Sequence, residues 1–206
     1  MFKDIILLKQ ANFITNKNIK IKGMESAFEN CVFLENVNFS GFITNEIKSL
    51  KKLFYNCASL SEFDFSQIDT SNVEDMSYLF ASSSISKFTP SKFNTKSVKD
   101  MSHFFEDCNS LQEIQFPELD TSNLIDISYM FKSCQSVETI DLSPFDTSQV
   151  VYMQGLFQTC ISLNNLQIGN INTGSSIDMS YMFEDCRLLK TLDLSNFNTE
   201  KVANMS

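Results

Sequence analysis

The stretch Val98-Lys-Asp-Met-Ser-His-Phe-Phe-Glu-Asp-Cys108 decides the fold, because the chain repeats it along most of its length. Its second phenylalanine recurs every 26 residues, with one step of 25. This slot holds Phe28, Phe54, Phe80, Phe105, Phe131, Phe157 and Phe183. Three residues after each phenylalanine comes a cysteine, except in the third unit, where Ser83 takes that place. A period this strict, held in more than one slot, is typical of a stacked-repeat protein.

The first half of each unit has the apolar spacing of an α-helix. In the stretch from Val73 to Ser83, the slots at i, i+3, i+4 and i+7 counted from Met76 are apolar across most of the units. Such spacing places apolar side chains on one face of a helix. We therefore predict a helix of about three turns in this half of every unit.

The second half of each unit has the pattern of a short strand. In the stretch from Leu111 to Leu119, Ile114 and Phe116 alternate with polar residues, which predicts a strand with one buried face. The same two slots hold Val37 and Phe39, Phe63 and Phe65, Ile140 and Leu142, Leu166 and Ile168, and Leu192 and Leu194. In the third unit Pro90 takes an inward strand position. Because proline has no N–H to donate, we expect the sheet to be weak or bent there.

A loop with an invariant threonine leads from each strand to the next unit. The threonines are Thr44, Thr70, Thr95, Thr121, Thr147, Thr173 and Thr199. A hydroxyl at such a corner can satisfy backbone groups. We therefore predict a structural role for this slot.

Together these halves predict an α/β solenoid that resembles a leucine-rich-repeat arc with 26-residue coils. Strands stack about 4.8 Å apart, whereas packed helices need about 8 to 10 Å. On that basis the parallel sheet is expected on the concave side and the helices on the convex side.

Stacked coils share one core, so we expect residues 1–206 to form a single elongated repeat domain. Residues 1–20 fit the period poorly and are expected to form a degenerate N-terminal capping coil. Residues 21–201 make seven repeats, and residues 202–206 begin an eighth, which predicts a cut inside a longer array.

The cysteines share one slot, so their side chains are expected to point the same way. A disulfide needs side chains that converge. We expect reduced, buried thiols that act as small hydrophobic residues.

Composition and charge exclude several classes of partner. The net charge of −9 argues against nucleic acid and against an anionic membrane surface. No apolar run approaches the roughly 20 residues that span a bilayer, so we expect no membrane insertion by this segment. The first nine residues lack the features of a signal peptide, which predicts either a protein made without one or a mature or trimmed piece.

The sequence offers no catalytic chemistry. The single histidine, His103, stands in a slot that other units fill with tyrosine. Cysteines 26 residues apart in one slot do not surround a metal, and five scattered glycines make no phosphate-binding loop. We expect no enzyme activity, no cofactor and no metal site.

Two surfaces are candidates for binding. The first is the concave sheet, where carboxylates are predicted at Glu62, Asp64, Glu113, Asp141 and Asp193. The second is a broken aromatic row on the convex side, formed by Tyr78, His103, Tyr129 and Tyr181. Exposed aromatic residues are enriched where proteins bind partners. The alternatives are a solvated acidic surface and rings that shield one another, and of the two surfaces we favour the concave sheet for binding.

The residues also resemble a known family. The segments 69–80 (Asp-Thr-Ser-Asn-Val-Glu-Asp-Met-Ser-Tyr-Leu-Phe) and 186–199 (Cys-Arg-Leu-Leu-Lys-Thr-Leu-Asp-Leu-Ser-Asn-Phe-Asn-Thr) are similar to the 26-residue repeat of bacterial surface proteins. That family is grouped with the BspA-like leucine-rich repeats and a mycoplasmal domain of unknown function. The resemblance covers residues 21–206, and it implies a recognition or adhesion module displayed at a cell surface or secreted.

Two functions remain open from the sequence. The first is a non-enzymatic recognition module that binds a protein or glycan partner outside the cell. The second is an intracellular, cytoplasmic scaffold that uses the same arc within a larger assembly. A signal or anchoring segment in the full-length protein would favour the first.

Overall fold

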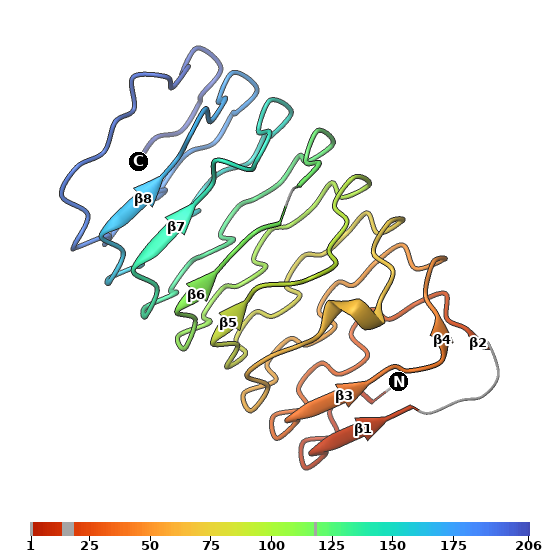
Figure 1. Ribbon diagram of the computed structural model, residues 1–206. Coiled ribbons are helices and arrows are strands. Elements are labelled where there is room, and N and C mark those ends of the chain that lie inside the picture. The colour runs from red at the N-terminus through yellow and green to blue at the C-terminus, as the bar shows by residue number, and fades with distance from the viewer. Residues whose placement is uncertain (1, 14–18, 118) are drawn as a thin grey trace.

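The computed structural model describes residues 2–13, 19–117 and 119–206, and these form a stack of similar coils. Six strands follow one another along one side of the stack, which we call the strand side (Figure 1). They are β1 (Gln10–Asn12), β3 (Asn36–Asn38), β5 (Lys87–Phe88), β6 (Glu113–Ile114), β7 (Thr139–Asp141) and β8 (Asn165–Gln167). Two further strands, β2 (Ile19–Lys20) and β4 (Phe42–Ile43), pair at another corner of the first coils.

All strand pairs are parallel, as predicted for successive coils, but the sheet is broken into pairs. The pairs are β1 with β3, β5 with β6, and β7 with β8. The strand predicted around Phe63 and Phe65 is replaced by a short 3₁₀ turn, η1 (Phe65–Gln67). The strand predicted around Leu192 and Leu194 is also not formed.

The predicted helices on the convex side are wrong, because no α-helix occurs in the described residues. The stretch from Val73 to Ser83 consists of two successive turns, closed by hydrogen bonds from Leu79 N to Met76 O (3.3 Å) and from Ser83 N to Phe80 O (2.9 Å). Each turn has a residue with positive φ, here Tyr78 (58°) and Ser82 (58°). An α-helix needs a φ near −63° throughout, so these residues interrupt any helix.

The turns are bonded to the next coil rather than along their own axis. The N–H groups of Met76, Tyr78, Phe80 and Ser82 donate to carbonyls 24 residues further on, over 2.7 to 3.0 Å. In an α-helix these N–H groups would donate to carbonyls of the same helix and could not bond the next coil. Packed helices would also hold neighbouring coils about twice as far apart as paired strands do. Two four-residue turns bury the same slots as a helix, and this similarity explains why the apolar pattern was misleading. We call this part of each coil the turn side.

The side chains of the phenylalanine slot form a column through the core, and their burial confirms the prediction. Six members from Phe28 to Phe157 are at most 1% exposed, and Phe183 at the last full coil is half-buried. Neighbouring rings are stacked with centroids 5.7 to 6.0 Å apart. Phe2 extends this column, because its ring stacks on Phe28 at 5.3 Å.

Phe2 continues the phenylalanine column into the first coil. It lies exactly one period before Phe28, and its N–H donates to Ala27 O. The predicted capping coil of residues 1–20 therefore has a regular beginning, although residues 14–18 lie outside the described residues.

The cysteine slot lies beside the phenylalanine column, as predicted. Five of the six thiols are buried, and each donates to the carbonyl of the phenylalanine slot one coil earlier, as Cys134 does to Phe105 O over 3.1 Å. Burial raises the pKa of the Cys108 thiol to about 12 and that of the less buried Cys186 to about 11. These thiols remain protonated at neutral pH, so they are poor nucleophiles.

The threonine column has the predicted structural role. The Thr147 hydroxyl donates to Asn172 O (2.9 Å) and accepts from Asn172 N (2.7 Å), so it bonds both sides of one residue in the next coil. Thr70, Thr121 and Thr173 do the same. Each of these four hydroxyls thus joins two successive coils by two hydrogen bonds, at the corner where the chain turns away from the sheet.

Truncating Phe131 to alanine should lower the free energy of unfolding by about 3 to 5 kcal/mol, because it leaves a cavity in the middle of the column. Chemical denaturation measures this loss. Phe33, whose side chain is 45% exposed, is the matched control, and its replacement by alanine should cost at most about 0.5 kcal/mol. Similar losses for the two variants would contradict the buried column.

Thiol labelling should be slow in the native protein, because burial protonates and covers the cysteines. We expect Cys186, the least buried of the six, to react first and the other five to react only after denaturation. Labelling with a chromogenic disulfide, followed by mass spectrometry, identifies the order. Rapid modification of Cys134 in the folded chain would be inconsistent with this core.

Candidate functional site

The five predicted carboxylates lie on the strand side, but they do not form one continuous acidic strip. Glu62 and Glu113 belong to one column, and Lys87, which stands between them, pairs with Glu113 at 2.9 Å. Asp64, Asp141 and Asp193 belong to the next column, where Asp141 lies opposite Gln167 of the following strand. Neutral and basic side chains therefore separate the acidic residues.

The three aspartates each hold a turn. Asp64, Asp141 and Asp193 accept the backbone N–H two residues further on, over 2.8 to 2.9 Å. Hydrogen bonds from Ser66 hold the pKa of Asp64 below its usual value, and those from Ser195 do the same for Asp193. The Asp-x-Ser pattern in this slot thus has a structural cause, although one carboxylate oxygen of Asp141 and of Asp193 stays free to meet solvent or a partner.

A groove of about 330 Å³ lies on the strand side where the strand row is interrupted between β3 and β5. In Figure 1 the coil between β3 and β5 has no arrow, and the coiled ribbon of η1 follows further along the same coil. The lining includes Val37, Glu62, Phe63, Asp64, Lys87 and Pro90, so the groove contains two of the five predicted carboxylates.

The backbone hydrogen bonds on the strand side depart from the regular pattern around this groove. In a regular coil, Leu142 N donates to the backbone carbonyl of Gln167 in the next coil. The equivalent N–H, that of Phe39, is taken by the side chain of Gln67 at 2.8 Å. Two units after Phe39, Pro90 fills the same slot, and it has no N–H to donate toward the following coil.

The predicted aromatic row exists on the turn side, and its rings lie against one another. The centroids of Tyr78 and His103 are 4.1 Å apart with nearly parallel planes, and those of His103 and Tyr129 are 4.9 Å apart. These three side chains are only partly exposed, whereas Tyr181 is separate and 44% exposed. Tyr55, which the sequence pattern does not place in this slot, extends the row by an edge contact with Tyr78 at 6.2 Å.

Gly155 explains the break in the row. It fills the tyrosine slot with φ of +59°, and a Cβ atom there would lie 2.3 Å from the ring of Tyr129. Tyr129 therefore covers the backbone of Gly155, and both faces of its ring are occupied.

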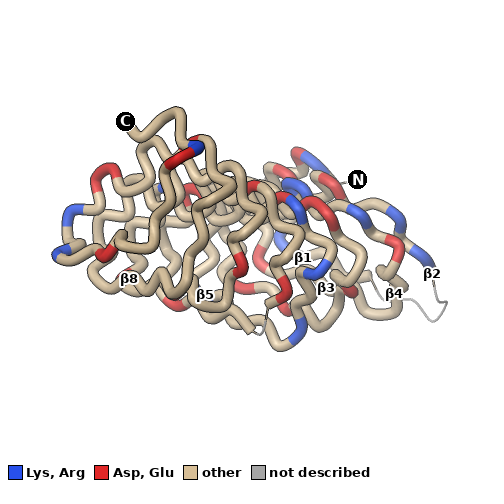
Figure 2. Tube along the Cα trace, turned by 90° about the horizontal axis from the view of Figure 1, so that it is seen from above, with Lys and Arg blue, Asp and Glu red and all other residues tan. Residues whose placement is uncertain are grey.

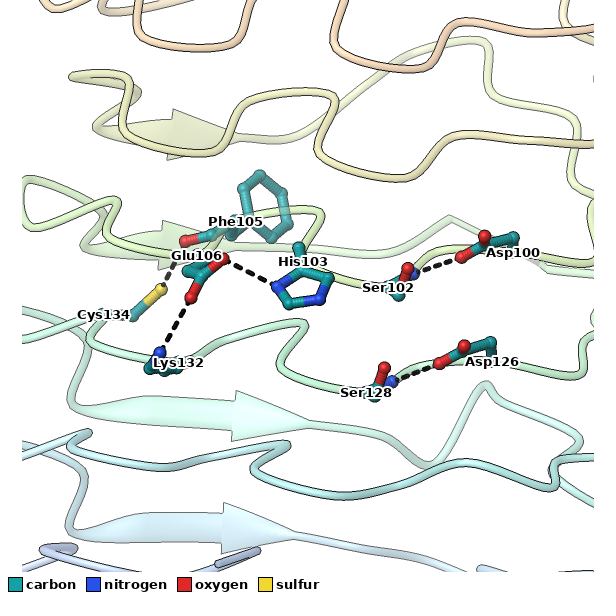
Figure 3. Close-up of polar contacts among 9 residues, drawn as sticks. All are labelled: Asp100, Ser102, His103, Phe105, Glu106, Asp126, Ser128, Lys132 and Cys134. Atoms are coloured by element: carbon teal, nitrogen blue, oxygen red, sulfur yellow. Dashed lines mark hydrogen bonds and ion pairs between the residues drawn. The ribbon is translucent and has the colours of Figure 1, made fainter.

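A charged network fixes His103 beside the row, as Figure 3 shows. His103 Nδ1 lies 2.7 Å from Glu106 Oε2, and Lys132 Nζ lies 3.0 Å from Glu106 Oε1. Partial burial acts to raise the pKa of Glu106, but the hydrogen bonds from His103 and Lys132 outweigh it and lower this pKa. His103 is held by Glu106 on one side and by the flanking tyrosine rings, an arrangement that resembles a structural clamp.

Sequence reasoning missed a column of aspartates on the turn side. Asp75, Asp100 and Asp126 stand in successive coils, paired by isolated parallel bridges. Each accepts the N–H of a serine two residues further on at 2.8 Å, as Figure 3 shows for Asp100 and Asp126. Burial, together with the charges of Asp126 and Asp75, raises the pKa of Asp100. The repeated Asp-Met-Ser and Asp-Ile-Ser triplets were the available signal.

The described residues contain no group of three or more side chains placed to hold a metal ion. None of their helices has the length and apolar character needed to cross a membrane. Charge is uneven along the stack: residues 104–206 contain 14 of the 25 acidic residues but only 4 of the 16 basic ones. In the N-terminal coils, acidic and basic residues are interspersed (Figure 2).

Replacing Asp100 by asparagine should stabilise the protein at pH 7, because asparagine keeps an oxygen for Ser102 N–H and removes a partly buried charge that lies between Asp75 and Asp126. The raised pKa means that the folded state binds the proton more tightly than the unfolded state. The wild-type protein is therefore stabilised fully below the ordinary pKa near 4 and loses this stabilisation as pH rises through the raised value.

Urea denaturation should accordingly show a gain for Asp100→Asn at pH 7 that shrinks toward pH 4. Asp193→Asn is the control, because the pKa of that exposed carboxyl is lowered and its replacement should give no gain. A gain for Asp100→Asn that stays constant with pH would show that charge burial is not its cause.

Comparisons with known proteins agree with this architecture. A leucine-rich repeat protein from Bacteroides ovatus has a similar fold, with a TM-score of 0.59 at 17% identity. The match covers 89% of this chain and 43% of that one, so the chain spans less than half the length of the similar structure. A comparison with curated proteins gives no match. The family model described as "Mycoplasma protein of unknown function, DUF285" matches residues 22–140 and 125–206, and the chain therefore belongs to this family.

Proposed function

We propose that this chain is a recognition module that binds a protein partner through its strand side and is displayed at a cell surface or secreted. The observation that carries the proposal is the groove on the strand side, because it lies at a coil that forms no strand and is open to solvent. Concave sites with a few polar groups are where proteins usually bind ligands. A leucine-rich-repeat-like stack supplies the extended surface that protein recognition needs.

The turn side is the weaker candidate, because its aromatic groups contact one another. The ring of His103 lies between Tyr78 and Tyr129, and Tyr129 covers Gly155. An aromatic platform for a sugar needs an exposed ring face, and in this row only Tyr181 is largely exposed. These contacts favour a protein partner over a glycan. They also favour the alternative that the rings of the row shield one another and bind no partner.

Charge favours a basic partner. The net charge is −9, and the excess of acidic residues is concentrated in residues 104–206. On the strand side of these coils, Asp141 and Asp193 are exposed, and only one carboxylate oxygen of each accepts a hydrogen bond within its turn. Complementary charge accelerates encounter and rejects acidic competitors, so binding should weaken as ionic strength rises.

Site-specific cross-linking tests the proposed face. A photoreactive phenylalanine at Thr139, an exposed residue of β7, should cross-link the partner. The matched control is the same residue at Ile125, which is 40% exposed on the turn side and should give no cross-link. The product must be competed away by unlabelled protein and reduced at high salt. Cross-linking from position 125 alone would overturn the choice of face.

Surface display has its own test. Antibody against the folded chain should label intact cells of the source organism, and brief protease treatment of those cells should remove the signal. Labelling that requires permeabilised cells would favour the intracellular scaffold instead.

A further inference from the structure

One slot of the turn side, which faces solvent, changes its character along the stack. In the N-terminal coils it holds Lys48, Glu74 and Lys99 in succession. Both lysines form ion pairs with Glu74, Lys48 at 3.4 Å and Lys99 at 2.8 Å. Charges of opposite sign therefore alternate along this part of the slot and pair with one another.

In the following coils the same slot is apolar. It holds Ile125, Val151 and Ile177, and the two isoleucines are each 40% exposed. The N–H groups of Val151 and Ile177 donate to the carbonyls one coil earlier, over 2.8 and 3.0 Å, so the three residues stand in register. At about 4.8 Å per coil they form a stripe about 10 Å long, which we call the apolar stripe. The N-terminal coils form the same hydrogen bonds with charged residues in this slot, so the fold does not require apolar side chains here.

Carboxylates lie on one flank of the apolar stripe. The next slot along the chain holds Asp126, Tyr152 and Asp178, which are bridged from coil to coil. Tyr152 is 39% exposed and adds a large ring to the apolar surface. Each aspartate is partly exposed and uses Oδ1 to accept a backbone N–H of its own turn. The Oδ2 atom of each forms no hydrogen bond with a described residue and faces a partner without losing the turn.

Few basic side chains lie near the apolar stripe. Lys99, at its N-terminal end, is already paired with Glu74. The slot on the other flank is neutral until the last coil, since it holds Asn123, Gln149, Ser175 and then Lys201. Asp126 and Asp178 form no ion pair with any described residue. The stripe therefore has one acidic flank and one largely neutral flank.

We propose that the apolar stripe binds an amphipathic α-helix of a second protein partner, with basic residues along one edge of that helix. Helical residues at i, i+3 or i+4 and i+7 lie about 5 to 6 Å apart, close to the spacing of the coils. Apolar residues at this spacing cover the stripe and Tyr152, as in other helix-binding surfaces. Lys or Arg residues on one edge of the helix then meet Asp126 and Asp178.

Charge favours this occupant over a second copy of the chain. Residues 104–206 contain 14 acidic and 4 basic residues, so two such halves repel each other. The same excess attracts a basic helix and accelerates its encounter with the stripe. This surface goes beyond the strand side proposed above, and its partner is a different one.

Peptide binding tests the proposal. The probe is a capped, fluorescently labelled peptide of about four helical turns, made of leucine at helical spacing and lysine elsewhere. One control carries glutamate in place of lysine, and the other has the composition of the probe in an order without an apolar face. Fluorescence anisotropy should show that the probe binds at least about tenfold more tightly than either control. Equal binding of the probe and the rearranged peptide would overturn the proposal, because charge alone would then explain it.

Variants that copy the N-terminal coils locate the site. Ile125→Lys, Val151→Glu and Ile177→Lys together give the stripe the alternating charges that this slot carries there, so the fold should be kept. The triple variant should weaken the probe about tenfold or more. Phe33→Ser is the matched control, because it removes an exposed apolar side chain from a slot that holds serine in other coils. An equal loss in Phe33→Ser would indicate unspecific adhesion of an apolar peptide and would contradict the site.

A second pair of substitutions tests the acidic flank and does not alter the stripe. Asp126→Asn and Asp178→Asn keep the oxygen that accepts the turn N–H, so the turns are preserved while the charge is removed. Together they should weaken the probe about tenfold and reduce the dependence of its affinity on salt. Unchanged affinity in this variant and in the triple variant overturns the proposal, whether or not either changes stability.

Sedimentation of the chain alone tests the competing occupant. The chain should remain a monomer at the concentrations used for peptide binding. A dimer that the triple variant abolishes would show that a second copy covers the stripe, and the helix proposal would be wrong.

The strand side and the apolar stripe can fail separately. A photoreactive phenylalanine at position 125 should cross-link the lysine peptide, although it should not cross-link the partner of the strand side. If the strand-side partner still cross-links from position 139 while the peptide does not bind, the recognition function stands and the helix site is wrong. If the peptide binds but no cross-link forms from position 139, the helix site stands and the proposed recognition face is wrong.

Discussion

Stacking of each residue on its equivalent in the next coil, at the spacing of a parallel strand pair, is the constraint on which the whole molecule depends. The phenylalanine rings satisfy it by lying face to face at 5.7 to 6.0 Å. The backbone satisfies it on both sides of the core, because the turns are hydrogen-bonded between coils in the same way as the strands. An α-helix is too wide for this spacing, so a chain that bonds every coil at both sides has no room for one.

Like-on-like stacking is favourable for phenylalanine but unfavourable for charge, and the chain solves this problem in two ways. On the turn side, Asp75, Asp100 and Asp126 remain stacked, and each is stabilised by the backbone N–H of a nearby serine. In the outer slots, opposite charges alternate instead, as in the bridges from Lys48 and Lys99 to Glu74. Stacking the aspartates costs stability at neutral pH, as the raised pKa of Asp100 indicates. The exposed ion pairs in the outer slots contribute little to stability.

The sequence predicted the features that repeat with the period, and it failed where secondary structure or a single coil departs from it. The columns of Phe105, Cys134 and Thr147 follow from the 26-residue period alone, because identical slots in stacked coils must share an environment. The helix prediction failed because Tyr78 and Ser82 adopt positive φ, a property that a tyrosine does not reveal in sequence. The groove lies at a coil that forms no strand, where Asp64 caps η1 and Gln67 accepts the N–H of Phe39, and neither contact was predictable from the repeat.

Because the columns join each residue to its counterpart one period away, the length of the array is a separately adjustable property. Recombination between two copies of the repeat would remove or add a complete coil and would leave every remaining column continuous. The groove is the exception, because its lining comes from three neighbouring coils, those of Val37, Gln67 and Pro90. Natural variants of this chain should therefore differ freely in the number of coils after residue 104, whereas an exchange within residues 62–91 would erase the groove.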